Sequence, residues 1–317
     1  DTSSSQEDGN SQLYVWGRND HGIGNGSTTT QTSPLKLTGN DDYKDVKYIS
    51  SFAGDYDNGN SDTATQLFFL TSTGKCYFAG RNNNGQGGIG STSDAHTFTH
   101  SGGSLRFREV YCNENNSMAI EGVPGTGHHG QTYGAWGTDT KIYNCGYNSH
   151  NQVRNDNHSA QNTWYDYAPN ATVYTKNSSG TAVSFPQGRI VWGMPEQTGD
   201  TGGMICLDCN GNLWYWGYDD DYDHTTGHDG TEVDSPQSIK SVICGVMDYT
   251  ANEHNLGPEG VYPAYVFYQT QNSNRSCLHV VDSKGRLLSM GWNTYEVNMK
   301  GQQGDTRTMG LNTNDIF

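Results

Sequence analysis

The sequence contains few apolar residues, few charged residues and no long hydrophobic run. Of its 317 residues, 32% are apolar and 16% are charged. The four apolar residues at 67–70 are typical of its longest hydrophobic stretches, whereas a membrane-spanning helix needs about 20 consecutive apolar residues. We therefore expect no membrane span.

Positive charge is also scarce. The chain has 18 Lys and Arg against 34 Asp and Glu, which gives a formal net charge of −16. Binding to nucleic acid requires clustered Lys and Arg that replace the counterions of the phosphates. The composition therefore argues against a nucleic-acid partner.

Catalytic sequence motifs are absent as well. The sequence has no nucleophile elbow, no phosphate-binding loop and no HExxH zinc motif. Paired carboxylates could serve glycoside hydrolysis, but that mechanism depends on a separation that a sequence does not give. We predict that the protein is not an enzyme and needs no cofactor.

Cysteine is present without a metal-binding or disulfide pattern. The chain has seven cysteines, an odd number in a chain too long to need disulfide staples. Cys206 and Cys209 form a CxxC pair, but no second ligand pair accompanies them, as a zinc site would require. We predict free thiols in the core.

The residues that are present form a repeat. A strand-like run ending in Gly, with Asn or Asp two places later, occurs at 13–19, 76–82, 142–148, 213–219 and 287–293. Its glycines are Gly17, Gly80, Gly146, Gly217 and Gly291, at intervals of 63, 66, 71 and 74 residues. Self-similarity at a nearly constant interval is typical of repeat folds.

Each repeat contains a hairpin signal. Gly74, Gly211 and Gly285 lie in polar turns six residues before the repeat glycine, which favours two antiparallel strands. A further strand-like run precedes each hairpin, at 46–50, 107–112, 188–193 and 239–245. The pattern predicts an all-β fold, a β-propeller with antiparallel four-stranded blades.

We assign residues 11–317 to these propeller repeats and residues 1–10 to a polar N-terminal tail or linker. Repeats share one continuous core, so a single domain suffices for this length. Because the sequence starts with Asp1 rather than Met, we expect a processed or partial product.

Three stretches resemble the regulator of chromosome condensation (RCC) repeat family: residues 13–26, 68–90 and 239–251. The resemblance extends over nearly the whole chain and implies a β-propeller. Members of that family generally close with seven blades. With about five repeats visible, we expect part of a longer protein or an atypical ring of about five blades.

The resemblance also assigns structural roles. Trp16 and Trp216 should bury their rings between blades, and the glycine that follows each should let a neighbouring backbone approach closely. A side-chain oxygen should close the turn beyond each strand. The residues that would supply it are Asn19, Asn82, Asn148, Asp219 and Asn293.

Two acidic clusters have the alternate spacing of a calcium loop. They comprise Asp219, Asp221 and Asp223 in one loop, and Asp55 and Asp57 in another. In the first, His224 stands where the sharp turn needs glycine and Gly230 stands where a bidentate Glu is needed. Solvated acidic loops are the favoured interpretation, with calcium the alternative.

Partner binding is expected at segments that exceed the minimal repeat, because loops on a rigid scaffold carry variable contacts. One such segment, 121–137, contains His128 and His129. The other, 252–275, contains an aromatic run of the kind enriched at interfaces and sugar-binding platforms. Its candidate residues are Tyr262, Tyr265, Phe267 and Tyr268. The alternative is that this run is an ordinary blade strand.

The composition is rich in Gly, Asn, Ser, Thr, Asp and Tyr, a style found in virion and surface proteins. We therefore predict a structural or adhesive propeller on a virion or extracellular surface, most plausibly a bacteriophage tail or decoration protein. Its partners would be other subunits of that assembly or a host glycan. The RCC family suggests two alternatives, namely guanine-nucleotide exchange on a small GTPase and secreted protein inhibition.

Overall fold

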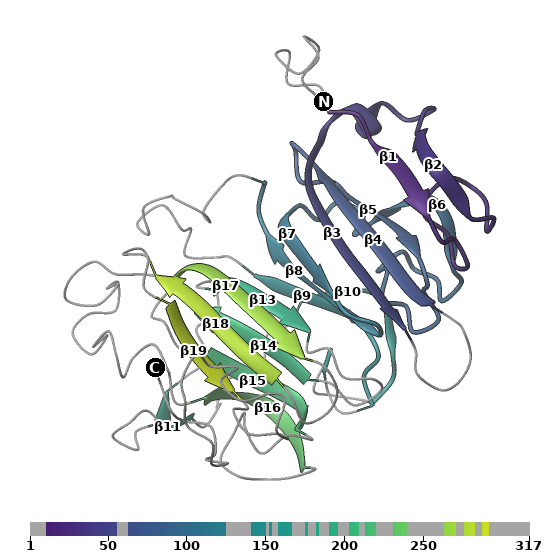
Figure 1. Cartoon of the computed structure of the whole chain (residues 1–317). Coiled ribbons are helices and arrows are strands. Elements are labelled where there is room, and N and C mark those ends of the chain that lie inside the picture. Colours follow the sequence, from purple (N-terminus) through teal and green to yellow (C-terminus); the bar gives the residue numbers. More distant parts are fainter. Residues whose placement is uncertain are drawn as a thin grey trace, which may run out of the picture. The chain divides into compact units, whose positions relative to one another are not determined.

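A computed structural model describes residues 11–55, 63–124, 141–149, 152–153 and 158–166, and strands further along the chain up to Gly291 (Figure 1). The chain divides into two compact units. Unit 1 comprises Asp1–Thr126, Ile142–Tyr147 and Ser159–Asp166, and unit 2 comprises Gly127–Lys141, Asn148–His158 and Tyr167–Phe317. No helix in the described part is long and apolar enough to cross a membrane.

Unit 1 contains three antiparallel sheets. Sheet 1 pairs β1 (Tyr14–Gly17) with β2 (Gln31–Lys36), and a short 3-10 helix, η2 (Asp41–Lys44), follows it. Sheet 2 has the order β3 (Val46–Asp55), β4 (Thr63–Thr71), β5 (Cys76–Gly80) and β6 (Ala95–Ser101). Sheet 3 has the order β7 (Phe107–Cys112), β8 (Asn116–Glu121), β9 (Ile142–Gly146) and β10 (Gln161–Asp166).

Unit 2 also consists of antiparallel sheets. Sheet 4 has the order β13 (Ile190–Pro195), β14 (Gly203–Asp208), β15 (Leu213–Asp219) and β16 (Thr231–Ile239). Sheet 5 has the order β17 (Pro263–Thr270), β18 (Ser276–Asp282) and β19 (Leu287–Gly291). A small ribbon pairs β11 (Thr175–Lys176) with β12 (Ala182–Val183).

The five copies of the sequence repeat fall in five different sheets, as the repeat interval predicts. Their strands are β1, β5, β9, β15 and β19. The strands β5, β9, β15 and β19 are each the third strand of their sheet, counted from the strand that comes first in the chain. The fold is therefore an all-β propeller with antiparallel four-stranded blades, as expected from the sequence.

One strand assignment needs correction. The run at 239–245 was expected to open the fifth repeat, but Ile239 is the last residue of β16, and residues 240–245 lie outside the described part. The first strand of sheet 5 is instead β17, which pairs with β18 along its whole length.

Sheets 1 and 2 pack through alternating side chains. Leu13 and Val15 of sheet 1 lie in a buried cluster with Tyr77 and Ala79 of β5. Successive side chains of a strand point to opposite faces. We call the face with Leu13 and Val15 the front face of its sheet, and the face with Tyr77 and Ala79 the back face of the next sheet.

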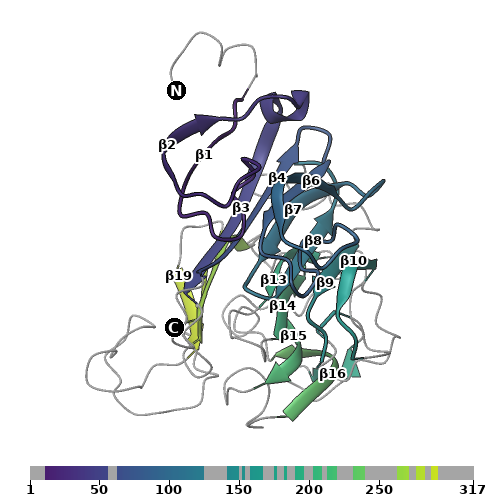
Figure 2. The same ribbon diagram turned by 90° about the vertical axis from the view of Figure 1, so that its right-hand side faces the viewer.

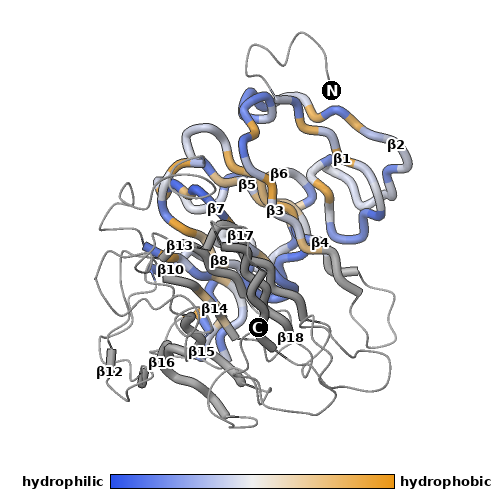
Figure 3. The backbone as a smooth tube through the Cα atoms, turned by 60° about the vertical axis from the view of Figure 1, so that its left-hand side comes forward, coloured by the Kyte–Doolittle hydropathy of each residue, from blue (hydrophilic) through white to orange (hydrophobic). Residues whose placement is uncertain are grey.

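The same rule holds between sheets 2 and 3. Cys76 and Phe78 alternate with Tyr77 along β5, so they lie on the front face of sheet 2. They share a second buried cluster with Tyr143 and Cys145 of β9, which occupy the back face of sheet 3. Hydrophobic stretches accordingly lie along β4 and β5 in Figure 3.

A side-chain oxygen closes the turn beyond the third strand at Asn82 and Asn148, as predicted. At Asn19 the prediction is wrong, because Oδ1 has no hydrogen-bond partner in the described part of the chain and Nδ2 instead donates to the Ser27 and Thr29 carbonyls. The side chains of Asp219 and Asn293 lie outside the described part. Asn82 Oδ1 accepts a hydrogen bond from the Gly87 amide at 2.7 Å, and its Nδ2 donates to the Ser91 carbonyl at 2.8 Å. Asn148 Oδ1 accepts from the Val153 amide at 2.7 Å. Asn82 and Asn148 are both fully buried, so these bonds are made away from water.

The loop after each such turn crosses to the fourth strand of the next sheet, and glycine makes this possible. A Cβ atom at Gly22 would lie 2.6 Å from the Ala95 carbonyl oxygen, and one at Gly85 would lie 2.5 Å from the Asn162 Cα. Both glycines have positive φ values. Ala95 opens β6 and Asn162 lies in β10.

The repeat glycine allows an equally close approach inside a sheet. Gly80 has φ +121° and Gly146 has φ +113°. A Cβ atom at Gly80 would overlap the carbonyl oxygen of Thr65, and one at Gly146 would overlap that of Asn115. In both sheets that carbonyl accepts a backbone hydrogen bond from the residue after the glycine.

Gly80→Ala should therefore lower the free energy of unfolding by about 3 kcal/mol or more, since it combines backbone strain with overlap of the Thr65 carbonyl. Gly17→Ala is the matched control. Gly17 has a similar φ of +118°, but in the part of the chain that the structure describes no atom lies within 4 Å of its would-be Cβ. Chemical denaturation measures both. If Gly80→Ala and Gly17→Ala lowered the free energy of unfolding equally, the role assigned to the contact with the Thr65 carbonyl would be contradicted.

A carboxylate ties η2 to sheet 2. Tyr77 Oη donates a 2.5 Å hydrogen bond to Asp42 Oδ2, and Lys75 Nζ lies 3.1 Å from the same oxygen. The hydrogen bond from Tyr77, helped by Lys75, holds the pKa of Asp42 below its usual value of 3.8 against the opposing effect of burial. Ionised Asp42 therefore stabilises the fold at neutral pH.

Because the folded pKa is lowered, this stabilisation is present above about pH 4 and is lost as the pH falls through the folded pKa. Asp42→Asn should unfold at a lower temperature at pH 7, by an amount corresponding to about 1 kcal/mol. It should also lose less stability than the wild type between pH 7 and pH 3. Asp41→Asn, which alters a fully exposed neighbouring side chain, should match the wild type in thermal melts at both pH values.

Candidate functional site

The tryptophan of the first repeat is on the surface, contrary to the prediction that it is buried between blades. Trp16 is 61% exposed and Tyr14 is 42% exposed. The corresponding residues of β5, Tyr77 and Ala79, are buried. The side chain of Trp216 lies outside the described part, so its predicted burial stays a prediction.

The exposure of Trp16 follows from the packing rule. Tyr14 and Trp16 alternate with Leu13 and Val15 along β1, so they lie on the back face of sheet 1. The back faces of sheets 2 and 3 are covered by the front face of the preceding sheet. Neither buried cluster of the described residues includes Tyr14 or Trp16.

The edge of β1 is also open within the described part of the chain. Its one partner strand there is β2, whereas β5 and β9 have partners on both sides. Figure 2 shows β1 and β2 as a two-stranded ribbon beside β3. Gly17 keeps the positive φ of Gly80 and Gly146, yet no atom of the described residues lies within 4 Å of its would-be Cβ.

A third exposed residue lies on β3, the first strand of sheet 2. Ile49 of β3 is 60% exposed and pairs across the sheet with Phe69, which pairs with Tyr77. Directly paired residues share a face, so Ile49 lies on the back face of sheet 2. Phe69 and Tyr77 are covered there, in the cluster with Leu13 and Val15, and Ile49 is not.

We name Tyr14, Trp16, Gly17 and Ile49 the β1 edge surface. It combines two exposed aromatic rings, one exposed aliphatic side chain and an unpaired strand edge. Interaction sites share these features, namely exposed apolar side chains and an unpaired strand edge.

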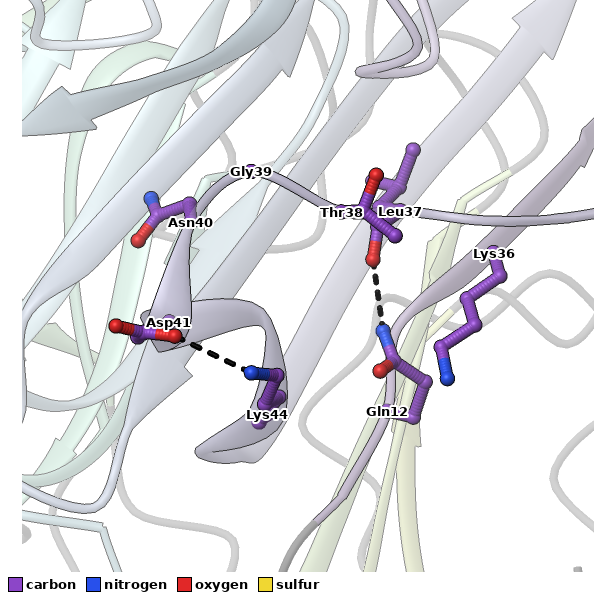
Figure 4. Close-up of a pocket in the computed structure, with 8 residues that line it drawn as sticks. All are labelled: Gln12, Lys36, Leu37, Thr38, Gly39, Asn40, Asp41 and Lys44. Carbon is purple, nitrogen blue, oxygen red and sulfur yellow. Dashed lines mark hydrogen bonds and ion pairs between the residues drawn. The ribbon is translucent and has the colours of Figure 1, made fainter.

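A pocket of about 360 Å³ opens beside the start of β1 (Figure 4). Gln12 Nε2 donates to the Leu37 carbonyl at 2.9 Å, and Lys44 Nζ lies 3.2 Å from Asp41 Oδ1. The other residues that line it are Lys36, Thr38, Gly39 and Asn40. Its groups are amides, carbonyls and one ion pair, which suit a small polar ligand.

The described thiols of unit 1 are buried in the core. Cys76, Cys112 and Cys145 are free and buried in the cluster between sheets 2 and 3. Burial raises the pKa of Cys112 to about 12 and raises that of Cys145 well above its usual value. These thiols stay protonated at neutral pH, so they are poor nucleophiles and metal ligands.

The sequence predicted that the cysteines are buried in the core as thiols. Cys206 is buried in β14, in agreement with this prediction. Cys209, its CxxC partner, lies outside the described residues. Among the residues that are described, no group of three or more His, Cys, Asp or Glu side chains could hold a metal ion.

The binding residues predicted from the sequence lie in or beside unit 2. Tyr265, Phe267 and Tyr268 belong to β17 and pair with Val281, His279 and Leu278 of β18. The aromatic run is thus a blade strand, the alternative weighed above. Tyr262, His128 and His129 lie outside the described residues.

The sequence also predicted that the two long segments occupy the same place in their repeats, between the first strand and the hairpin turn, and this prediction is wrong. Residues 121–137 fall between β8 and β9, the second and third strands of sheet 3. Residues 252–262 precede β17, the first strand of sheet 5. The repeat alignment was displaced because the run at 239–245 was taken for that first strand.

The calcium candidates are only partly described. Asp55 ends β3 and Asp219 ends β15, so each stands where a strand leaves its sheet. Asp57, Asp221 and Asp223 lie outside the described residues. Calcium binding at either loop remains a prediction.

Comparison with known proteins bears on the fold. No protein-family model matches the chain, and no curated protein matches it. Among solved structures, human WBSCR16 is similar with a TM-score of 0.55 and 16% identity, over 95% of this chain and 58% of that one. Yeast RCC1 (Prp20) bound to Kap60 gives a TM-score of 0.48 and 13% identity, over 89% of this chain and 52% of that one.

The chain therefore spans little more than half the length of these structures. A further Saccharomyces cerevisiae structure, Prp20p, gives a TM-score of 0.38 at 14% identity, over 73% of this chain and 59% of that one. At such identities a likeness concerns the fold alone. The likeness to WBSCR16 agrees with the propeller architecture described above, and the RCC-like propeller fold expected from the repeats is confirmed.

Proposed function

We propose that this chain is a non-enzymatic propeller scaffold that binds a protein partner, and that the β1 edge surface is part of its binding site. The observation that carries the proposal is the exposure of Tyr14, Trp16 and Ile49. They make up three of the four large hydrophobic residues exposed in the described part of the chain. The fourth is Leu35.

Aromatic residues on a rigid support are favourable anchors for a partner. Tyr and Trp bury a large area with little loss of rotamer freedom and are enriched among residues that dominate interface energies. β1 is held in place by Val15 and Leu13, whose side chains are buried against sheet 2. A partner would therefore meet a preformed surface.

The absence of catalysis is part of the same proposal. The described thiols are protonated and buried, and the pocket beside β1 offers a lysine–aspartate ion pair without a nucleophile held by a base. A binding scaffold needs neither a metal nor a cofactor, and we propose none.

The setting we propose is a virion or extracellular surface, with other subunits of the assembly, or a host glycan, as partners. It is supported by the composition, which has 41 Gly and 20 Tyr but only 18 Lys and Arg in 317 residues. Guanine-nucleotide exchange is the competing function suggested by the RCC family. Faster nucleotide release from a small GTPase in the presence of the chain would overturn the scaffold proposal.

The double variant Tyr14→Ser, Trp16→Ser should lose partner binding while staying folded. Because both rings are exposed, we expect its free energy of unfolding to change by less than about 1 kcal/mol. Cross-linking on intact particles or cells that carry the chain, read by mass spectrometry, should recover a partner protein with the wild type and much less of it with the variant.

Leu35→Ser is the matched control, since Leu35 is 37% exposed but lies on β2, away from the open edge. It should retain the cross-link. Recovery of the chain only as an uncross-linked monomer from intact particles would refute the scaffold function. Equal recovery with wild type and double variant would place the interface elsewhere.

A further inference from the structure

We propose that Lys75, His100 and Arg106 form a binding site for one phosphate or sulfate group, at the end of sheet 2 that adjoins η2. We name these three residues the basic cluster. The site does not depend on the β1 edge surface or on the protein binding proposed above. It is carried by the placement of three basic side chains around one carboxylate, in a chain that has 34 Asp and Glu against 18 Lys and Arg.

Lys75 and His100 lie beside the same tyrosine. His100 of β6 is paired with Tyr77 of β5, and their rings are 5.3 Å apart in an edge-to-face arrangement. Lys75 Nζ and Tyr77 Oη both contact Asp42 Oδ2, at 3.1 and 2.5 Å. Directly paired residues share a face of the sheet, so the ammonium group and the imidazole are both on the back face of sheet 2. His100 is exposed there.

Arg106 is held near these two residues by the backbone. Its Nη1 donates to the Leu105 carbonyl at 2.7 Å and to the Gly103 carbonyl at 3.3 Å. Its Cβ lies 3.2 Å from the place that a Cβ of Gly74 would occupy, and Gly74 directly precedes Lys75. Both hydrogens of Nη1 are used by these carbonyls, so the parallel N–H groups on Nε and Nη2 remain for the paired oxygens of an anion.

Positive charge exceeds negative charge around His100. Partial burial, followed by Arg106 and Lys75, lowers the pKa of His100 below its usual value of 6.5, and Asp42 opposes them. Asp42 already accepts from Tyr77 and Lys75. An anion between the basic groups would offset the remaining positive charge and would raise the pKa of His100.

A tetrahedral dianion suits this arrangement better than a carboxylate does. Its oxygens can accept from the Arg106 fork, the Lys75 ammonium and the His100 imidazole at the same time. Lys75 and Arg106 less Asp42 leave one positive charge, and protonated His100 adds a second, which a dianion balances. Because the whole chain has a net charge of −16, it repels long polyanions. We therefore expect a small ligand with a single phosphate or sulfate group.

Sodium sulfate is the first probe. Titrated into the full chain at constant ionic strength, it should shift the ring resonances of His100 in a saturable way, as measured by NMR with labelled histidine. The resonance is assigned by its loss in His100→Gln. Sodium phosphate should act likewise, and the ratio of the two affinities identifies the preferred group. Sodium acetate should bind about tenfold more weakly or worse.

Arg106→Gln should bind sulfate about tenfold more weakly, because the N–H fork is lost. Its circular dichroism should be unchanged, and Lys75→Gln, whose side chain is 39% exposed, decides the question if Arg106→Gln fails to fold. Arg18→Gln is the matched control. It removes the same charge from an arginine that pairs with Asp20 beyond the other end of β1, and it should bind as the wild type does.

Asp42→Asn distinguishes binding from a structural role. It removes the carboxylate that competes with the ligand for Lys75, so it should bind sulfate about threefold more tightly. A basic cluster that served only to hold η2 in place would gain no affinity for an anion from this change.

The affinity for sulfate should rise about threefold as the pH falls from about 7.5 to about 5.5, because sulfate stays doubly charged while His100 gains a proton. The other groups that face His100 are Lys75, Arg106, Tyr77 and Asp42. Asp42 stays ionised in this range because its pKa lies below 3.8, and Tyr77 stays protonated because burial raises its pKa. His100→Gln should therefore remove the pH dependence.

Three outcomes would overturn the inference. Sulfate could give no saturable shift of His100, acetate could bind as tightly as sulfate, or Arg106→Gln and Lys75→Gln could both bind as the wild type does. Sulfate binding that appears only in the double variant Glu7→Gln, Asp8→Asn would assign the basic cluster to carboxylates of the chain itself, and would overturn the inference too.

Discussion

Sheets 2 and 3 depend on one close contact, between the repeat glycine at the end of the third strand and a backbone carbonyl, that of Thr65 in β4 or that of Asn115 just before β8. At Gly80 and Gly146 this contact leaves no space for a Cβ atom, and the following amide donates to the same carbonyl. The contact fixes how far the second strand extends along the third. Because strand register decides which side chains face which neighbour, it also fixes the alternation that places Tyr77 and Ala79 on the back face of their sheet.

Buried polar side chains complete the arrangement around this contact. Asn82 and Asn148 bind backbone groups of the loop that follows, while Gln66 Nε2 donates at 2.6 Å to the carbonyls of Asn113 and Glu114 in the turn between β7 and β8. Buried amide groups that are paired with the backbone in this way favour one loop conformation, since any other would leave those groups without a partner. The loops of unit 1 therefore inherit their geometry from the sheets.

The repeat interval was sufficient to predict the sheets and the position of the third strand in each. It also predicted the role of Asn82 and Asn148, because a side-chain oxygen just after a strand end can accept a hydrogen bond from the backbone of the turn. It could not identify the first strand of sheet 5. Pro263–Thr270 and the run at 239–245 are equally strand-like, and only the pairing of β17 with β18 distinguishes them. Local sequence sets strand tendency, while pairing is a property of the whole sheet.

The candidate site could not be predicted for a related reason. The position of Trp16 in its repeat is occupied by Ala79, Cys145, Trp216 and Met290 in the others, so the repeat fixes a direction of the side chain rather than a degree of burial. Burial depends on whether another sheet covers that face, which is a property of neighbours and not of the residue. A scaffold residue in one repeat can therefore be a binding residue in another. Among the described residues, Trp16 is exposed on the strand β1, which has one partner strand there, and this exposure satisfies the condition for such a change of role.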